Sequence, residues 1–194
     1  MKKAAKQKIF VISGPSRVGK DAITRGLLRR KELNLQKVIT ATSRVKRRGE
    51  VDGRDFYFFT PEEFEEKVKK GYFLEWALLS GGRYYGTPVS EFDRIRAKSK
   101  NVIMNIEVQG ARQLSKMRDD VTKIFIKPDS VAHLIRRMKE AGFSKEETPA
   151  RLTDCKRELK DASRYDYRVV NREGKLEEAI AKVADIIQKE INRS

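Results

Sequence analysis

The chain has 194 residues, which is enough for one compact domain with a sizeable core but too few for two independent cores. Its 44 Lys and Arg against 28 Asp and Glu give a net charge of +16, which favours anionic partners such as nucleotides. One Cys and one His exclude an internal disulfide and a Cys/His metal cluster, and no apolar run approaches the ~20 residues of a membrane span. We therefore expect a soluble, cytoplasmic protein.

Short apolar runs alternate with amphipathic stretches along most of the sequence. We expect strands at residues 9–13, 38–41, 55–59, 73–79, 102–106, 123–126 and 168–170. We expect helices at residues 21–31, 61–70, 88–98, 109–116, 130–140 and 176–191. Because parallel strands need crossover connections, which are usually helices, this alternation predicts an α/β fold with a parallel sheet.

Two segments depart from this alternation. Residues 38–88 contain short aromatic strands, Gly-Glu and Asp-Gly turn signals and one clear helix, which predicts a small, partly antiparallel insert. Residues 135–163 are helical and strongly charged around a short break that contains a Gly. A helical hairpin with so few apolar residues is a candidate mobile lid, because little buried surface would hold it against the rest of the chain.

The segment GPSRVGKD, residues 14–21, follows the first predicted strand and begins the first predicted helix. A Gly-rich turn in this place points backbone N–H groups at a phosphate, and the helix N-terminus adds its positive dipole. Gly14 and Gly19 allow the turn, and Lys20 supplies a positive charge for phosphate oxygens. The sequence therefore predicts a phosphate-binding loop, although the usual pattern ends in Ser or Thr where this chain has Asp21.

The hydroxyl that usually ends such a loop helps to hold Mg²⁺, together with an Asp at the end of a later strand. Here the loop ends in Asp21, and the strand expected at 102–106 carries Asn105. A carboxylate plus an amide keeps two oxygen ligands and one negative charge, as a hydroxyl plus a carboxylate does. Our hypothesis is that Asp21 and Asn105 form a compensated Mg²⁺ site. A loop that has lost its function is the alternative.

Four further stretches indicate a second ligand behind the loop. Arg44 and Arg47 are three residues apart in a basic segment, and their guanidinium groups suit a second phosphate. Residues 84–88, YYGTP, predict a tight turn with phenol and hydroxyl donors. Glu75 interrupts an apolar strand, and Glu107 ends a core strand. Each stretch alone has a plain structural interpretation, as a solvated loop, a hairpin turn or a paired carboxylate, but their joint occurrence favours a binding site.

These motifs together resemble those of guanylate kinases, from about residue 9 to residue 187. The shared blocks, in the order of the family, are GPSxVGK, TSRxxRxGEVDGxDF, FLEWA, YYGTP, VQGA, an RR…RL pair in the lid segment, and VVN near the end. The resemblance implies a P-loop three-layer α/β/α core with a parallel sheet, a small mixed β insert that binds GMP, and a helical lid. It assigns residues 1–37, 97–134 and 164–194 to the core, 38–96 to the nucleoside-monophosphate domain and 135–163 to the lid.

The resemblance implies transfer of the γ-phosphoryl group of ATP·Mg²⁺ to GMP or dGMP, giving ADP and GDP, in purine nucleotide metabolism. Its motifs assign catalysis to Lys20, Arg44, Arg137 and Arg151. They assign ATP binding to the loop and to one Asn near the end: Gly14, Pro15, Ser16, Arg17, Val18, Gly19, Lys20, Asp21 and Asn171. They assign GMP binding to Thr40, Arg44, Arg47, Phe56, Glu75, Tyr85, Thr87 and Glu107, and the metal to Asp21 and Asn105.

The chemistry of the base agrees with this assignment. Guanine presents N1–H and N2–H₂ donors on one edge, and a carboxylate such as Glu75 can accept both hydrogen bonds. Adenine has an acceptor at N1, so a buried carboxylate that faces it would have no hydrogen-bond donor. An unpaired group of this kind can make an enzyme prefer guanine over adenine by orders of magnitude. The chain also departs from the family: Phe56 stands where a Tyr is usual, Glu107 where an Asp is usual and Arg17 where a Gly is usual.

Three alternatives stay open. Ribose 1,5-bisphosphate kinases resemble this chain in a loop that ends in Gly-Lys-Asp and in an Asn at the strand end, but they lack the EVDG, LEWA and VQGA blocks. Non-catalytic guanylate-kinase-like modules bind protein ligands at the former GMP site, and an intact Lys20 argues against that role. Nucleic-acid binding follows from the charge alone, but the basic residues are spread along the chain, so we expect ATP and GMP as partners. A homo-oligomer stays open.

Overall fold

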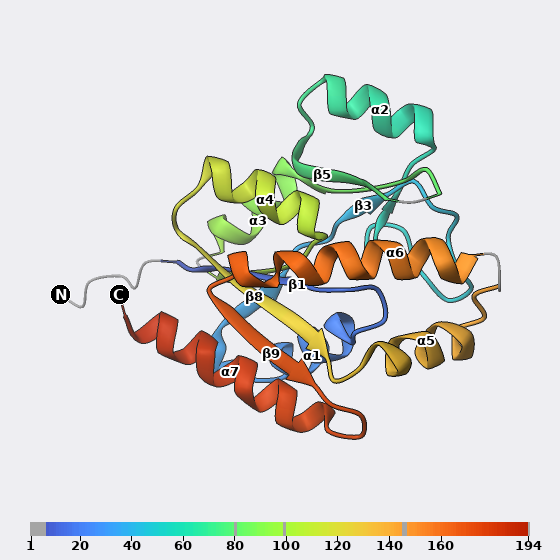
Figure 1. Cartoon of the computed structure of the whole chain (residues 1–194). Coiled ribbons are helices and arrows are strands. Elements are labelled where there is room, and N and C mark those ends of the chain that lie inside the picture. The colour runs from blue at the N-terminus through green and yellow to red at the C-terminus, as the bar shows by residue number, and fades with distance from the viewer. Residues whose placement is uncertain (1–6, 80, 99, 145–146, 194) are drawn as a thin grey trace.

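The computed structural model describes residues 7–79, 81–98, 100–144 and 147–193 (Figure 1). Its centre is a five-stranded sheet in the order β2-β7-β1-β8-β9, in which all neighbouring strands are parallel. The strands are β1 (Ile9–Ser13), β2 (Leu35–Lys37), β7 (Asn101–Asn105), β8 (Val121–Pro128) and β9 (Tyr167–Asn171). The predicted α/β fold with a parallel sheet is confirmed.

Helices cover both faces of this sheet. The helices that do so are α1 (Lys20–Leu28), α3 (Val89–Ala97), α4 (Val108–Met117) and α7 (Leu176–Asn192). Side chains on successive strand residues point to opposite sides, so Phe10 and Ile12 of β1 pack with α1 and α7, whereas Ile9 and Val11 pack with α3 and α4. Figure 1 shows α7 and α1 below the sheet and α3 and α4 above it. The predicted three-layer core is confirmed.

The insert forms a second sheet, in the order β4-β3-β6-β5, covered by one helix at the top of Figure 1. Its elements are β3 (Ala41–Thr42), β4 (Tyr57–Phe58), α2 (Pro61–Lys69), β5 (Phe73–Leu79) and β6 (Arg83–Pro88). β3 and β4 are parallel, and the other two pairs are antiparallel, so the sheet is mixed as predicted. Phe64 of α2 holds the layers together, because its ring stacks on those of Phe73 at 4.2 Å and Tyr84 at 5.1 Å.

The prediction of a strand at residues 38–41 is wrong. The chain instead forms β2 before this range and β3 at its end, and residues 38–40 connect the two sheets. Val38 is fully buried in this connection, and its N–H donates to the carbonyl of Ile103 at 3.1 Å. The apolar character of the segment therefore reflects burial at the junction between core and insert, which a short apolar run cannot distinguish from a strand.

The tight turn expected at residues 84–88 is also wrong, because these residues belong to β6. Gly86 pairs with Ala41 on one side and with Trp76 on the other. A Cβ on Gly86 would lie 3.0 Å from the carbonyl oxygen of Glu75 and would crowd the α2 helix, so this Gly serves close packing within a sheet. The remaining elements begin and end within a few residues of their predicted positions.

Two helices at the right of Figure 1 precede the last strand. They are α5 (Val131–Glu140) and α6 (Glu147–Lys160), and the short 3₁₀ helix η2 (Asp161–Arg164) follows them; a further 3₁₀ helix, η1 (Lys31–Leu33), follows α1. Ser130 caps α5 by accepting the N–H of His133 at 3.1 Å. Residues 145–146 of the expected lid, and residues 1–6, 80, 99 and 194 of the other expected domains, lie outside the described residues. The domain limits themselves stay predictions.

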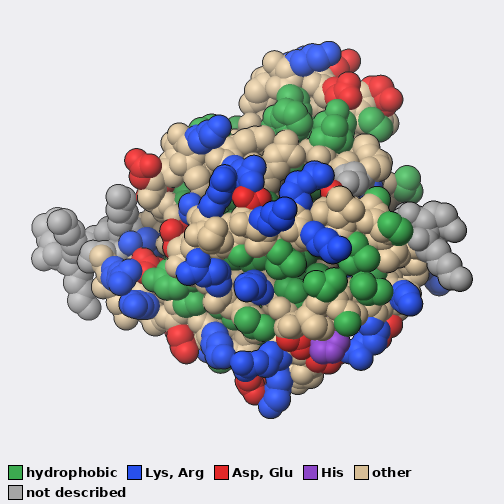
Figure 2. All heavy atoms as spheres, in the orientation of Figure 1, with side chains coloured by type: hydrophobic (Ala, Val, Ile, Leu, Met, Phe, Trp, Pro, Cys, Tyr) green, Lys and Arg blue, Asp and Glu red, His purple; other side chains and the backbone are tan. Residues whose placement is uncertain are grey.

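The surface carries charges of both signs. On the face in Figure 2, Lys and Arg side chains are scattered over the core with Asp and Glu side chains between them. This distribution is typical of a solvated surface and differs from one continuous basic track. Within the ranges that the structure describes, no helix combines the length and the apolar character that a membrane crossing needs.

Candidate active site

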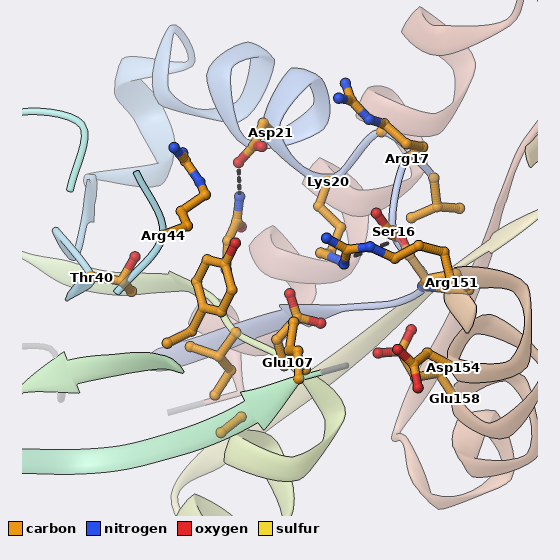
Figure 3. A pocket seen from close by; sticks show the side chains of 18 of the residues that line it. Ser16, Arg17, Lys20, Asp21, Thr40, Arg44, Glu107, Arg151, Asp154 and Glu158 are labelled. Atoms are coloured by element: carbon orange, nitrogen blue, oxygen red, sulfur yellow. Dashed lines mark hydrogen bonds between the residues drawn. The ribbon is translucent and has the colours of Figure 1, made fainter. Parts of the chain in front are cut away.

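One cleft of about 640 Å³ lies between the loop after β1, the insert and the helices α5 and α6. It collects most of the side chains that the sequence singled out: Pro15, Ser16, Arg17, Val18, Gly19, Lys20, Asp21, Thr40, Arg44, Arg47, Phe56, Glu75, Tyr85, Asn105, Glu107, Arg137 and Arg151. Gly14, Thr87 and Asn171 are the predicted site residues that do not line it. Figure 3 shows how the labelled side chains converge from the core, the insert and α6.

The loop between β1 and α1 depends on two glycines. Gly14 has φ +145°, and a Cβ there would lie 2.3 Å from the carbonyl oxygen of Ile126. Gly19 has φ +101°, and a Cβ there would lie 2.5 Å from the side chain of Asn171. Asn171 is buried beneath the loop, where its Nδ2 donates to the carbonyl of Val18 at 2.8 Å. Asn171 therefore braces the loop from β9, and its assignment to ATP binding stays a prediction.

Lys20 begins α1 and points back over the loop. Its Nζ donates to the carbonyls of Gly14 and, at 3.3 Å, Pro15. Burial alone would lower the pKa of Lys20, but the carboxylates of Glu107, Glu158 and Asp21 raise it above the ordinary value. The ammonium group is therefore charged at neutral pH and positioned where the loop would hold a phosphate.

Glu158 is a cleft residue that the sequence analysis missed. It lies on α6, and its Oε2 is buried without a hydrogen-bond donor among the described residues. Burial, followed by the neighbouring charge of Glu107, raises the pKa of Glu158, and the two carboxyl groups are close enough to share a hydrogen bond. Only tertiary packing brings α6 to this point, so no local sequence pattern could have identified Glu158.

Asp21 and Asn105 meet at the entrance of the loop. The Nδ2 of Asn105 donates to Oδ1 of Asp21 at 2.9 Å, which is the dashed line at Asp21 in Figure 3. The buried hydroxyl of Thr24 donates to Oδ1 of Asn105 at 2.6 Å. An ionised carboxylate only accepts hydrogen bonds, so the contact with Asp21 fixes which way the Asn105 amide faces.

This donor set fits a hard divalent cation. The carboxylate of Asp21 is exposed at the cleft beside Lys20, and oxygen ligands of this kind suit Mg²⁺. In the described ranges, no group of three or more His, Cys, Asp or Glu residues is arranged to hold a metal ion.

The basic segment of the insert is already ordered around one carboxylate. Arg44 donates to both oxygens of Glu50, at 2.7 and 2.5 Å, and its guanidinium lies 5.0 Å from the ring centre of Phe56. Burial opposes the charge of Arg44, but hydrogen bonds with Glu50 and Tyr85 raise its pKa. The backbone N–H of Arg47 also donates to Glu50, at 2.9 Å. Glu50 therefore holds both arginines in place, a role that the sequence analysis did not assign.

Glu75 is a buried carboxylate of the insert. It lies on β5 opposite Thr87 on β6, and the Thr87 hydroxyl donates to Oε1 of Glu75 at 2.6 Å. Burial raises the pKa of Glu75 to about 7, although the hydrogen bonds from Thr87 oppose this shift. Thr87 itself is fully buried behind Glu75, so it orients the carboxylate. Thr40 and Glu107 line the cleft on either side.

The start of α4 leaves room for this carboxylate. A Cβ on Gly110 would lie 1.7 Å from Oε2 of Glu75, so any larger residue here would displace that carboxylate. Glu107 is the N-cap residue of α4, which brings it to the same end of the helix. Gly110 belongs to the VQGA block, but nothing in the sequence alone connects it with Glu75.

The two predicted lid arginines approach the loop from different helices. Arg137 on α5 lies 3.4 Å from the carbonyl oxygen of Arg17 and pairs with Glu173 at 2.9 Å. Arg151 on α6 is buried, its Nε has no hydrogen-bond partner among the described residues, and its side chain points toward Lys20 in Figure 3. A buried guanidinium without a full set of acceptors is a suitable group to receive a phosphate.

Comparisons with known proteins identify the family of this chain. The family model described as Guanylate kinase matches residues 6–190. The guanylate kinase of Malacoplasma penetrans is 39% identical over 89% of this chain and 89% of its own length, and that of Synechocystis is 38% identical over 96% of both. The crystal structure of guanylate kinase from Anaplasma phagocytophilum superposes with a TM-score of 0.77 at 30% identity, covering 96% of this chain and 87% of that one. The chain therefore belongs to the guanylate kinase family.

Proposed function

We propose that this chain transfers the γ-phosphoryl group of ATP·Mg²⁺ to GMP or dGMP, giving ADP and GDP, as an enzyme of purine nucleotide metabolism. The observation that carries the proposal is Glu75, a buried carboxylate that faces the same cleft as the phosphate loop. Family membership supports the reaction type, since the relatives named above carry the name guanylate kinase. The roles of individual residues below are our own assignments.

Guanine recognition would rest on Glu75. Its carboxylate can accept hydrogen bonds from N1–H and N2–H₂ of guanine, whereas adenine would leave a buried negative charge facing an acceptor. Thr87 leaves Oε2 of Glu75 available, because it donates to Oε1. Arg44, Arg47 and Tyr85 would bind the acceptor phosphate, and Arg44 would then exchange part of its contact with Glu50 for that phosphate.

The donor side would be built by the loop and the start of α1. Backbone N–H groups of residues 16–20 and the ammonium of Lys20 would hold the ATP phosphates. When bound, Mg²⁺ would neutralise charge on those phosphates. Asp21 would be its protein ligand, and Asn105 would orient Asp21 through their 2.9 Å hydrogen bond. In this arrangement the amide oxygen of Asn105 stays with the Thr24 hydroxyl.

Transfer between the two nucleotides needs no covalent intermediate with the protein. The enzyme would position donor and acceptor in one cleft and stabilise the charge that develops on the transferred group. Lys20, Arg137 and Arg151, on α1, α5 and α6, are cleft cations that would do this together with Arg44. Closure of α5 and α6 over both nucleotides would exclude water and so suppress hydrolysis of ATP.

The experiment is a coupled assay of ADP release with purified protein, ATP and Mg²⁺, in which GMP, dGMP, AMP, CMP, UMP and ribose 1,5-bisphosphate are separate acceptors. Turnover with GMP or dGMP alone is the expected result. Turnover only with ribose 1,5-bisphosphate would identify the chain as a ribose 1,5-bisphosphate kinase. No turnover, together with tight binding of a protein ligand, would indicate a non-catalytic module. The Lys20→Ala variant controls for a contaminating kinase, since it should lose the activity.

A further inference from the structure

The backbone of Arg17 adopts a conformation that is unfavourable for a residue with a long side chain. It lies in the middle of the phosphate loop with φ +65°, in the left-handed region, and the other non-glycine residue with positive φ in the described ranges is Asn34 at +48°. Asn tolerates this region, whereas a long side chain such as Arg does so at a cost in strain. A glycine would give the loop the same path without strain. The side chain of Arg17 is therefore retained for something other than the shape of the loop.

The guanidinium of Arg17 lies over an aromatic ring from another part of the chain. Its Cζ lies 5.2 Å from the centre of the Phe143 ring, and the Cζ of Arg151 lies 5.3 Å from the same ring. Phe143 comes from the connection between α5 and α6. One ring thus orients two guanidinium groups at the edge of the cleft by cation–π contacts.

Arg17 and Arg151 lie in the cleft without an ion pair among the described residues, although carboxylates also line the cleft. Burial, followed by the guanidinium groups of Arg47 and Arg151, lowers the pKa of Arg17, and Asp21 opposes that shift. No carboxylate within the described part of the chain forms an ion pair with Arg17 or Arg151. Three arginines from the loop, the insert and α6 therefore face one cleft together with Lys20. Such a cluster favours a ligand with several negative charges.

We propose that the side chain of Arg17 is a further phosphate-contacting residue of the donor site, which binds the polyphosphate of ATP from within the loop and is oriented by Phe143. This proposal rests on the proposed function in taking ATP as the phosphate donor. Figure 3 shows Arg17 and Arg151 on the same side of the cleft, with Lys20 between them and the insert. A loop with Gly at this position would lack the contact.

The test compares Arg17→Gly and Arg17→Lys with the unchanged chain. ATP with Mg²⁺, and tripolyphosphate as a probe without a base, are titrated by calorimetry in the absence of GMP, and thermal unfolding is measured in parallel. We expect Arg17→Gly to unfold at the same or a higher temperature, because Gly relieves the left-handed backbone. We expect it to bind both ligands about tenfold more weakly, as the loss of one charge-assisted hydrogen bond predicts. Arg17→Lys should fall between the two.

Two further variants separate the side chain from the backbone. Asn34→Gly changes the other left-handed residue, which lies outside the cleft, and should leave ATP and tripolyphosphate affinity unchanged. Phe143→Leu keeps an apolar group but removes the ring, and should weaken both ligands severalfold without any change in charge.

Unchanged affinity of Arg17→Gly for both ligands would overturn the proposal, whatever its unfolding temperature. If the unfolding temperature were lower as well, the contact between Arg17 and Phe143 would instead be a structural contact that stabilises the loop against the lid. The titrations do not depend on turnover, so the role of Arg17 and the proposed function can fail separately. A chain that binds ATP but does not phosphorylate GMP contradicts the proposed function and leaves this result intact.

Discussion

Exchanging the residues at positions 21 and 105 tests whether the unusual end of the phosphate loop is a working metal site. The variants are Asp21→Ser, Asn105→Asp and the double variant, which restores the hydroxyl and carboxylate that such loops usually carry. In the unchanged chain the two side chains are joined by a hydrogen bond of 2.9 Å, and Thr24 holds the amide from behind. The two positions are therefore directly coupled, and their effects should not add.

The free-energy cost of each single substitution can be worked out from the positions of the two side chains. Asn105→Asp alone would place two carboxylates about 3 Å apart, and the Coulomb energy at that distance is roughly 1.4 kcal/mol in water and roughly 6 kcal/mol at an effective dielectric constant of 20. Since Asp21 is exposed and the carboxylates can turn apart, we expect a cost of about 1–3 kcal/mol. Asp21→Ser alone removes the negative charge and leaves the amide without its acceptor, at a similar cost. The double variant avoids both losses.

The assay should report metal binding apart from turnover. Binding of Mn²⁺ to the complex of protein and ADP can be followed by electron paramagnetic resonance, with kcat for GMP measured in parallel. We expect Asp21→Ser to bind Mn²⁺ roughly 5- to 100-fold more weakly, because the carboxylate ligand is lost. We expect Asn105→Asp to be less stable without metal, because its two carboxylates repel each other, and the double variant to recover most of both losses. Losses that simply add in the double variant would refute the compensated exchange. A gain in metal affinity for Asp21→Ser alone would show that the carboxylate impairs the site.

Three further results are expected at the acceptor site. Because Glu75 must be ionised to accept from guanine and burial raises its pKa to about 7, KM for GMP should rise up to about tenfold for each pH unit below 7, and a profile that stays flat would contradict this. Gly110→Ala should raise KM for GMP at least tenfold, because its Cβ would displace Glu75. The loss of stability should be smaller, because Ala favours the helix over Gly by about 1 kcal/mol. An unchanged KM would exclude the contact between residue 110 and Glu75. Phe56→Tyr should lower KM for GMP severalfold by adding a phenol near Arg44, and no effect would mean that this ring does not face the acceptor phosphate.

The parts of the site that the sequence could predict are those with a local pattern. The loop is recognisable because Gly14, Gly19 and Lys20 follow a strand and begin a helix, and this order along the chain fixes their place in space. Asn105 could be placed beside the loop because the ends of parallel strands meet at one edge of a sheet. The structure bears this out in the pairing of Ile12 with Asn105. In these cases chain position determines spatial position.

The parts that could not be predicted depend on contacts between distant segments. The salt bridge between Arg44 and Glu50 and the space that Gly110 leaves for Glu75 have no sequence signal of their own. The apolar run at 38–41 was mistaken for one strand because it is buried at the junction of the two sheets. Hydropathy reports burial, and a segment can be buried without being paired in a sheet.

The amide of Asn105 shows the same limit at the level of a single side chain. Its type and position predict an oxygen ligand for a metal. Its actual orientation is set by two partners, the acceptor Asp21 and the donor Thr24, and only the folded chain brings these together. The amide oxygen already accepts one hydrogen bond, from Thr24, whereas the carboxylate of Asp21 is exposed at the cleft, so we favour Asp21 as the ligand. The assignment of Asn105 to the metal stays a prediction.

The measurement that tests the central claim most directly is the ratio of kcat/KM for GMP to that for AMP, in the unchanged chain and in Glu75→Gln. Glu75 is only 3% exposed and is the buried carboxylate that would read the guanine edge. If Glu75 selects the base, the ratio in the unchanged chain is several orders of magnitude and falls at least about 100-fold in the variant, while the affinity for ATP is unchanged. A ratio that is the same in both proteins, or an equal loss of GMP and ATP affinity, would contradict the claim that Glu75 selects the base.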